Sequence, residues 1–93
     1  MAIQAYTQVP GMSSEMYDGM FRQASPALLA APGFIAHVAT PMDGGMAVTE
    51  IWESQEAVEA FLTANVYPMI EAAGMPRLQP QFRPIHNMVM AEK

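Results

Sequence analysis

The stretch APGFIAHVATPMDGGMAVTEIWESQEAVEAF, from Ala31 to Phe61, decides the fold of this chain. Within it, residues 34–39 and 46–52 are short runs rich in apolar and β-branched side chains, which predicts two strands. Residues 40–45 between them are dense in turn-forming types and predict a hairpin loop. Ser54 follows the second strand and predicts the N-cap of a helix. The stretch therefore predicts a strand, a turn, a second strand and a capped helix.

The chain before this stretch predicts a strand and a helix. Residues 3–9 alternate, which is typical of a strand with one covered face, and the run ends at a Pro-Gly pair. Ser13 or Ser14 then predicts a helix cap, and apolar residues follow at helical spacing. Proline at position 26 either kinks this helix or restarts it. The helix is expected to stop at Pro32-Gly33.

The chain after this stretch predicts a second helix that Pro68 bends or restarts and that Gly74 ends. A final strand is expected over residues 82–90, with Pro84 placing it at a sheet edge or in a bulge. The predicted order is βαββαβ over a single domain of residues 1–93. That order predicts an α+β, ferredoxin-like fold, in which a four-stranded antiparallel sheet carries both helices on one face.

The composition predicts that the other face of this sheet is covered by a second copy of the chain. Of the 93 residues, 52% are hydrophobic and only 14% are charged. Exposed apolar patches beyond a few hundred Å² usually mark an interface. We therefore expect a homodimer, in which a second sheet covers this face.

The charge and the cysteine count exclude several classes of function. Only four residues are Lys or Arg and the formal net charge is -5, so no basic surface for nucleic acid is expected. The chain has no cysteine, which excludes disulfides, a thiolate nucleophile and a Cys metal site, and fits a cytoplasmic protein. No apolar run approaches a membrane span, and the first residues do not resemble a secretory signal.

His37 and Glu50 are the residues most suited to catalysis. Imidazole titrates near neutral pH, so His37 can act as a general base. With a hairpin loop over about residues 40–45, Glu50 falls opposite His37 on the paired strand. A carboxylate there would orient the imidazole and raise its basicity. The alternatives are that His37 is a core or interface histidine and that Glu50 binds a helix terminus or an arginine of a partner chain.

Six further residues are candidates for binding a substrate. Trp52 shares a face with Glu50 and could stack a planar ring, or could be a core residue between sheet and helix. The hydroxyl of Tyr6 could donate to a developing oxyanion. The other candidates are apolar or lie on the last strand: Phe34, Met46, Phe61 and His86. The two histidines show no metal-binding spacing, so no metal site is expected.

Several of these segments resemble the antibiotic-biosynthesis-monooxygenase-like group of dimeric α+β barrel proteins. The resemblance is carried by Gly33-Phe34, by the hairpin TPMDGG at residues 40–45, and above all by EIWESQEA at residues 50–57. Later residues such as Pro68 and Gly74 also match. The resemblance spans most of the chain and implies the barrel architecture. Its members include cofactor-independent oxygenases of aromatic polyketides and haem-degrading enzymes, and related barrels include a polyketide cyclase.

Three catalytic sets known in that group are not intact in this chain. The helix position where haem-degrading members carry an iron ligand falls at residues 61–63, which are Phe, Leu and Thr. The asparagine of quinone-forming oxygenases corresponds to Val48, and the base of the cyclases corresponds to Met46. The resemblance therefore implies an architecture more specifically than a reaction.

Taken together, these features predict a small cofactor-independent enzyme that acts on a hydrophobic aromatic or polyketide-like molecule. A monooxygenase started by proton abstraction is favoured, with His37 as the base, Glu50 as its partner and Trp52 in the pocket. A polyketide cyclase or isomerase would begin with the same step and is the first alternative. A non-catalytic dimer that only binds a small molecule is the second alternative.

Overall fold

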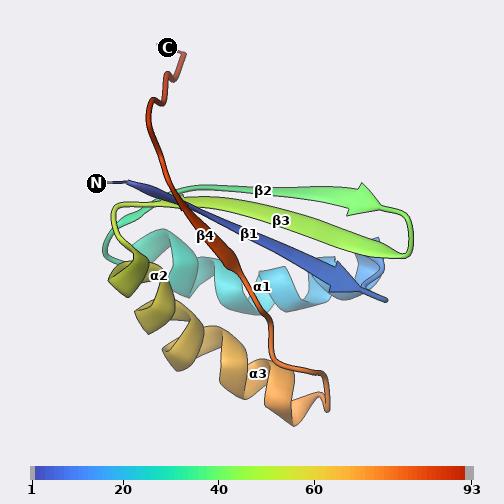
Figure 1. The fold of residues 1–93 in the computed structure, drawn as a ribbon. Coiled ribbons are helices and arrows are strands. Elements are labelled where there is room, and N and C mark those ends of the chain that lie inside the picture. Colours follow the sequence, from blue (N-terminus) through green and yellow to red (C-terminus); the bar gives the residue numbers. More distant parts are fainter. Residues whose placement is uncertain (1, 92–93) are drawn as a thin grey trace.

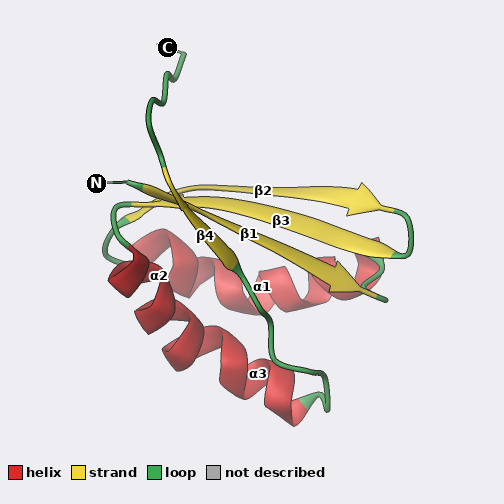
Figure 2. Cartoon of the chain, viewed as in Figure 1, coloured by secondary structure: helices red, strands yellow, loops and turns green. Residues whose placement is uncertain are grey.

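Four strands pair into one antiparallel sheet in the order β2-β3-β1-β4. The computed structural model describes residues 2–91. The helical segments all lie on one face of this sheet (Figure 1). The predicted α+β, ferredoxin-like βαββαβ fold is therefore confirmed. The elements in chain order are β1 (Ile3–Pro10), α1 (Ser14–Ala30), β2 (Phe34–Met42), β3 (Gly45–Trp52), α2 (Gln55–Phe61), the π-helical turn η1 (Leu62–Val66), α3 (Tyr67–Ala72) and β4 (Gln81–Pro84) (Figure 2).

Helix α1 begins with a side-chain cap and continues past its proline. The hydroxyl of Ser13 accepts a hydrogen bond from the backbone N–H of Met16 at 3.1 Å. This bond satisfies one of the donors that the first turn of a helix leaves free. Pro26 lies inside the helix, which is assigned as one element from residue 14 to residue 30. Of the two alternatives predicted at Pro26, a restart of the helix does not occur.

The helical region after β3 consists of three consecutive segments. Ser54 caps α2 by accepting from the backbone N–H of Ala57 at 3.1 Å, as predicted. Before Pro68 the chain widens into the π-helical turn η1, and α3 then begins with Pro68 in its first turn. Proline is common in the first turn of a helix because its ring fixes φ near the helical value. Gly74 follows α3 with a φ of +72°, a conformation that glycine adopts without strain.

The β2–β3 hairpin is longer and tighter than the sequence predicts. Its strands reach Met42 and Gly45, so the turn is only Asp43-Gly44 instead of a loop over residues 40–45. Gly44 has a φ of +76°. At Gly45 a Cβ atom would lie 2.4 Å from the carbonyl oxygen of Val9, so the close approach of β1 excludes any side chain there. These two glycines allow the strands to continue to the tip of the hairpin.

The last strand is shorter than predicted. β4 covers only Gln81–Pro84, where a strand over residues 82–90 is expected from the sequence. Its partner β1 begins at Ile3, which pairs with Pro84, so the ladder ends for lack of a partner. The N–H of Ile85 still donates to the carbonyl of Ala2 at 3.0 Å. Beyond this bond the chain leaves the sheet as an extended segment (Figure 1).

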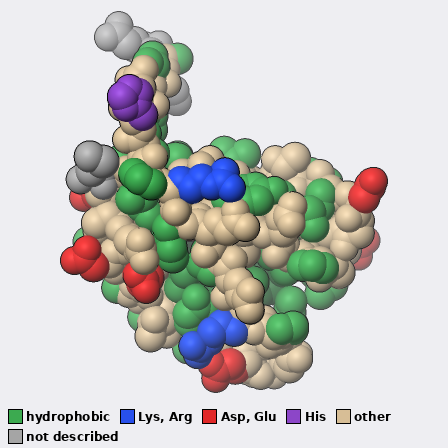
Figure 3. Space-filling view, viewed as in Figure 1, with side chains coloured by type: hydrophobic (Ala, Val, Ile, Leu, Met, Phe, Trp, Pro, Cys, Tyr) green, Lys and Arg blue, Asp and Glu red, His purple; other side chains and the backbone are tan. Residues whose placement is uncertain are grey.

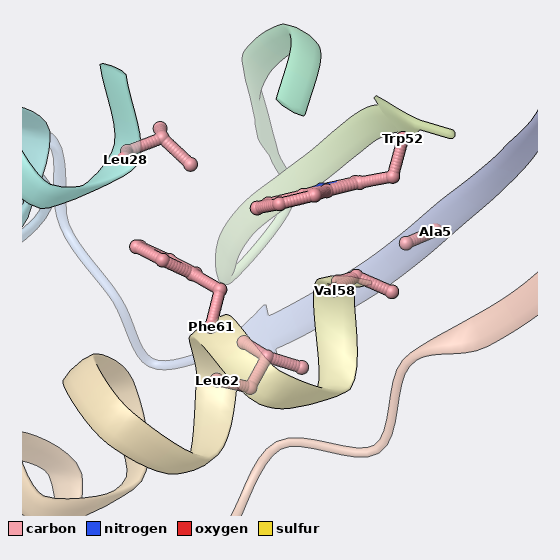
Figure 4. Packing of buried hydrophobic residues seen from close by; sticks show 6 residues of the cluster. All are labelled: Ala5, Leu28, Trp52, Val58, Phe61 and Leu62. Atoms are coloured by element: carbon pink, nitrogen blue, oxygen red, sulfur yellow. The ribbon is translucent and has the colours of Figure 1, made fainter. Parts of the chain in front are cut away.

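The side chains between the sheet and the helices form two apolar clusters. The first surrounds Trp52, which is completely buried, and includes Leu28, Val58 and Phe61 (Figure 4). The second is smaller and consists of buried side chains near the hairpin end of β1 and β3, which are Val9, Met12 and Met46. The site described below lies between these two clusters.

Charged side chains are sparse on the surface, as the low content of charged residues in the sequence predicts. On the face drawn in Figure 3, the basic side chains lie apart from one another and form no continuous patch. None of the described helices is long and apolar enough to cross a membrane. The face of the sheet that points away from the helices is not covered by any described element of the chain (Figure 1). Val38, which is 57% exposed, lies on that face.

Candidate functional site

Four polar side chains form a continuous line of hydrogen bonds beneath the sheet. The hydroxyl oxygen of Tyr17 lies 2.6 Å from Nε2 of His37. The other ring nitrogen, Nδ1, lies 2.6 Å from Oε2 of Glu50. The second carboxylate oxygen, Oε1, accepts from Nε1–H of Trp52 at 2.9 Å. The line connects helix α1, strand β2 and strand β3.

The hairpin register brings two members of this line together. His37 pairs directly with Glu50 across β2 and β3, as the hairpin position predicts. Residues two apart on a strand share a face, so Trp52 lies beside Glu50 on β3. Strand geometry alone therefore positions three of the four side chains.

A bulge in β2 changes which side chains share the face of His37. Uninterrupted alternation along β2 would place Phe34 on the face opposite to His37. Instead the register shifts between Phe34 and Ala36, so that Phe34 pairs with Trp52 and contacts its ring edge-on at 5.4 Å. A bulge inserts one unpaired residue and so reverses the alternation beyond it. Both Phe34 and His37 consequently face the helices.

Helix α1 supplies the fourth member and a rigid wall. Tyr17 and Phe21 are one turn apart, and their rings stack at 5.5 Å between centroids. The ring of Phe21 also lies 5.1 Å from the imidazole of His37. The imidazole is therefore held by hydrogen bonds at both nitrogens and by an aromatic ring against its face.

The donors and acceptors of the line determine which ring nitrogen carries the proton. A carboxylate has no proton to give, so with Glu50 ionised the Nδ1–H of His37 donates to it. In the neutral imidazole Nε2 then has a free lone pair, which accepts the O–H of Tyr17. Burial, followed by the negative charges of Glu50 and Asp18, raises the pKa of Tyr17 above the ordinary value of 10.0. At neutral pH the phenol therefore keeps its proton.

The line forms one wall of an apolar pocket of about 120 Å³. Tyr17, His37 and Glu50 line it, and the side chains of His37 and Glu50 are 14% and 12% exposed. The remaining walls come mainly from apolar side chains of α1 and of the α2–η1–α3 region, among them Met20, Leu28, Phe61, Val66 and Ile70. A hydrophobic molecule bound there would meet polar groups on one side only.

Thr7 adds a separate polar group to the same pocket. It is the one buried polar residue in the described part of the chain, and it lines the pocket from β1. None of the side-chain hydrogen bonds among residues 2–91 involves its hydroxyl. The hydroxyl of Thr7 is therefore available to a ligand. The alternation of residues 3–9 predicts its orientation, but the sequence did not single it out.

Of the six residues predicted to bind a substrate, only Phe61 lines the pocket. Trp52 lies behind it as a core residue that holds Glu50. Phe34 and Met46 pack in the two apolar clusters and are not among the pocket residues. Tyr6 is on the uncovered face, where its hydroxyl accepts from Gln8. His86 is exposed beyond the end of β4.

Tyr17 is the member of the line that the sequence did not mark as a candidate for the site. Its spacing with Met20, Phe21, Ala24 and Leu28 places it on the inner face of α1, and all five line the pocket. A tyrosine at the first position of such a stripe is the available signal. Within residues 2–91 no group of three His, Cys, Asp or Glu side chains could hold a metal ion.

No family model matches the sequence, and no curated protein matches it. Solved structures do match. Rv0793 from Mycobacterium tuberculosis superposes with a TM-score of 0.74 at 8% identity over 97% of this chain and 100% of that chain. A mutant of SnoaB, a cofactor-independent oxygenase from Streptomyces nogalater, gives 0.67 at 11% identity over 95% of each chain. A monooxygenase from the gene ActVA-Orf6 of Streptomyces coelicolor, in complex with nanaomycin D, gives 0.62 at 17% identity over 98% of this chain and 93% of that chain.

These similarities extend over nearly the whole length of both partners in each comparison. Structures described as antibiotic biosynthesis monooxygenases from Deinococcus radiodurans and Chloroflexus aurantiacus are also matched. At such low identities the comparison concerns the fold. The resemblance predicted from the sequence is confirmed at that level.

Proposed function

We propose that this chain, which has the fold of the antibiotic-biosynthesis-monooxygenase-like proteins, is a small enzyme that removes a proton from a hydrophobic aromatic or polyketide-like molecule without a cofactor. The observation that carries the proposal is the Tyr17–His37–Glu50 line at the wall of an apolar pocket. A base at the edge of an otherwise apolar pocket is the arrangement that proton abstraction from a carbon acid requires.

In the proposed step, His37 is the base and acts through Tyr17. The O–H of Tyr17 covers Nε2, so the phenol passes its proton to the imidazole as its oxygen takes the proton of the substrate. The substrate becomes a carbanion or enolate, and His37 becomes an imidazolium. Glu50 stabilises that positive charge from the other side of the ring. Trp52 is a positioning residue, because its N–H fixes the carboxylate that orients His37.

Oxygenation is the favoured fate of the carbanion. An electron-rich carbanion or phenolate can itself react with molecular oxygen, so no metal or flavin is needed in the proposed step. The match to a structure described as a cofactor-independent oxygenase supports this choice. A cyclase or isomerase would use the same abstraction to start an aldol closure or a double-bond shift. A non-catalytic binding dimer would use the pocket without the proton transfer.

The proposed enzyme is a cytoplasmic homodimer in which a second copy covers the uncovered face of the sheet. Apolar side chains on that face support this proposal. Val38 is 57% exposed there, and Ile51 and Ala36, which are partly exposed, pair with each other beside it. Because the pocket lies on the opposite face, the catalytic proposal does not require the dimer to supply a residue.

The proposal is tested with 2-tetralone, a bicyclic ketone whose α-hydrogens are acidic. In D₂O at neutral pD, NMR follows the replacement of these hydrogens by deuterium, which reports proton abstraction alone. An oxygen electrode follows oxygen consumption in the same samples. Exchange with oxygen consumption supports the oxygenase, and exchange without it supports the cyclase or isomerase. Saturable binding without exchange supports the binding protein and contradicts an enzyme of either kind.

Two variants assign the step to the proposed residues. His37→Ala and Glu50→Gln are expected to slow deuterium exchange by about 100-fold or more, the usual contribution of a positioned base. Val38→Ala, next to His37 on the other face, is the matched control and is expected to leave exchange unchanged. Unchanged exchange and unchanged tetralone binding in His37→Ala would remove His37 from any role.

A further inference from the structure

The line at the pocket has the connectivity of a nucleophile, a base and an orienting acid. The O–H of Tyr17 points to Nε2 of His37, and Nδ1–H of His37 points to Glu50, both over 2.6 Å. Hydrolases activate serine or cysteine through the same order of groups. In this chain a phenol occupies the position of the nucleophile, and the proton abstraction proposed above does not use that capacity.

We infer that Tyr17 is a nucleophile that accepts an acyl group from a hydrophobic activated ester. Its oxygen attacks the ester carbonyl carbon while its proton moves to Nε2 of His37. The carbon–oxygen bond to the leaving alcohol then breaks, and that alcohol takes the proton from Nε2. Water, deprotonated by the same imidazole, attacks the acyl-tyrosine and releases the acid, and the phenol recovers its proton. The sum is an ester and water giving an acid and an alcohol.

The chemistry of a phenol suits both halves of this cycle. Tyrosine ordinarily ionises near pH 10, far below an aliphatic alcohol, so transfer of its proton to an imidazole is less costly. The phenolate is also a better leaving group, which favours hydrolysis of the acyl-tyrosine. Because burial raises the pKa of Tyr17, the proton leaves only when the base accepts it during attack.

The other tyrosines of the chain lack this arrangement. The chain contains three tyrosines and no cysteine. The hydroxyl of Tyr6 accepts a hydrogen bond from Gln8 on the uncovered face. The ring of Tyr67 lies under the guanidinium of Arg77, 4.4 Å away. Among the described residues, Tyr17 is the one tyrosine whose hydroxyl contacts a base, so the protein contains its own control residues.

The inference is tested with benzenesulfonyl fluoride, an apolar reagent that traps an activated phenol. The oxygen–sulfur bond forms, the sulfur–fluorine bond breaks, and fluoride leaves with the proton held by His37. Wild-type protein is labelled at neutral pH, digested and analysed by mass spectrometry over time. Because general-base assistance contributes a factor of about 100 or more, Tyr17 is expected to be labelled about 100-fold faster than Tyr6 and Tyr67. Equal labelling of the three tyrosines, or labelling of His37 instead, would overturn the inference.

The variants His37→Gln and Glu50→Gln separate activation from mere binding of the reagent. Both are expected to lower the labelling of Tyr17 to the rate of the other two tyrosines. Preferential labelling that persists in His37→Gln would show that the pocket only concentrates the reagent, and would contradict an activated nucleophile. In the acyl half of the test, wild-type protein is expected to release nitrophenolate from 4-nitrophenyl butanoate. If the sulfonyl fluoride labels Tyr17 selectively but unlabelled protein releases no nitrophenolate, the acyl transfer is contradicted.

The inference uses the same side chains as the proposed function, and the two fail in different measurements. Deuterium exchange into 2-tetralone forms no covalent bond to the protein, whereas sulfonylation requires one. Exchange without selective labelling would contradict only the nucleophile, and selective labelling without exchange would contradict only the proton abstraction.

Discussion

Two neighbouring residue pairs on the β2–β3 hairpin show how differently the two faces of the sheet are used. His37 and Glu50 face the helices, are hydrogen-bonded at 2.6 Å and line an apolar pocket. Val38 and Thr49, the next pair, face away from the helices, and Val38 is 57% exposed. A shift of the register by one residue would exchange these pairs between the faces.

The difference between the two pairs shows that the ionisable groups on the covered face are satisfied by one another. A carboxylate and an imidazole that are largely removed from water are costly unless they are hydrogen-bonded. Here Glu50 receives bonds from both His37 and Trp52, and His37 is bonded through both ring nitrogens. The site is therefore part of the core.

The largest expected difference concerns stability. Trp52 is completely buried at the centre of its cluster (Figure 4), so Trp52→Ala is expected to lower the free energy of unfolding by about 3–5 kcal/mol. Val38→Ala on the uncovered face is expected to change it by less than about 0.5 kcal/mol in a monomer. Urea unfolding of both variants measures the difference.

Concentration dependence makes this comparison informative about the homodimer. If a second copy covers the face of Val38, Val38→Ala destabilises the protein by more, and the unfolding midpoint of the wild type rises with protein concentration. A small effect of Val38→Ala, with a midpoint independent of concentration, would contradict the dimer. A small effect of Trp52→Ala would contradict its place in the core.

Local sequence patterns were sufficient for the fold and for three of the four members of the line. Alternation places Glu50 and Trp52 on one face, and the turn-forming residues place His37 opposite Glu50. This pairing is as predicted although the loop is shorter than expected, with β2 extending three residues further, to Met42, and β3 one residue, to Gly45. The paired residues Thr40 and Ala47 continue the same register toward the tip.

The remaining features depend on contacts between distant segments. Tyr17 lies 20 residues before His37, and its position is fixed by how α1 packs on the sheet rather than by its neighbours. The bulge lies at residues 34–36, which are Phe, Ile and Ala, and none of these residue types predicts a bulge. The end of β4 is set by the start of β1, since a strand cannot continue its ladder beyond its partner. These features follow from tertiary contacts, which the periodicity of a single segment cannot predict.

A smaller difference is expected between two threonines, Thr7 in the pocket and Thr49 on the uncovered face. Thr7→Val keeps the shape of the side chain and removes a hydroxyl that is free to bond a ligand. It is expected to weaken the binding of 2-tetralone by about 2- to 10-fold, which corresponds to one net hydrogen bond. Thr49→Val is expected to leave binding unchanged. Calorimetric titration measures both, and equal affinities for the two variants would exclude Thr7 from ligand recognition.

The smallest expected effect concerns the pH at which a tyrosine ionises. Tyr17 at the pocket is compared with Tyr6 on the other face. Because burial and the charge of Glu50 raise its pKa, Tyr17 is expected to ionise above pH 10.0 in the folded protein. Ultraviolet absorbance should show a late phase that Tyr17→Phe removes and Tyr6→Phe retains.

The same shift predicts a loss of stability in alkali. Below about pH 10 the phenol is protonated in both states and contributes no pH dependence. As the pH rises above this value, the unfolded chain loses the proton of Tyr17 while the folded chain keeps it, so the unfolded state binds fewer protons. The free energy of unfolding therefore falls until the raised pKa is passed. Tyr17→Phe should flatten this part of the profile, and an unchanged slope would show that Tyr17 is not the group held neutral against the charge of Glu50.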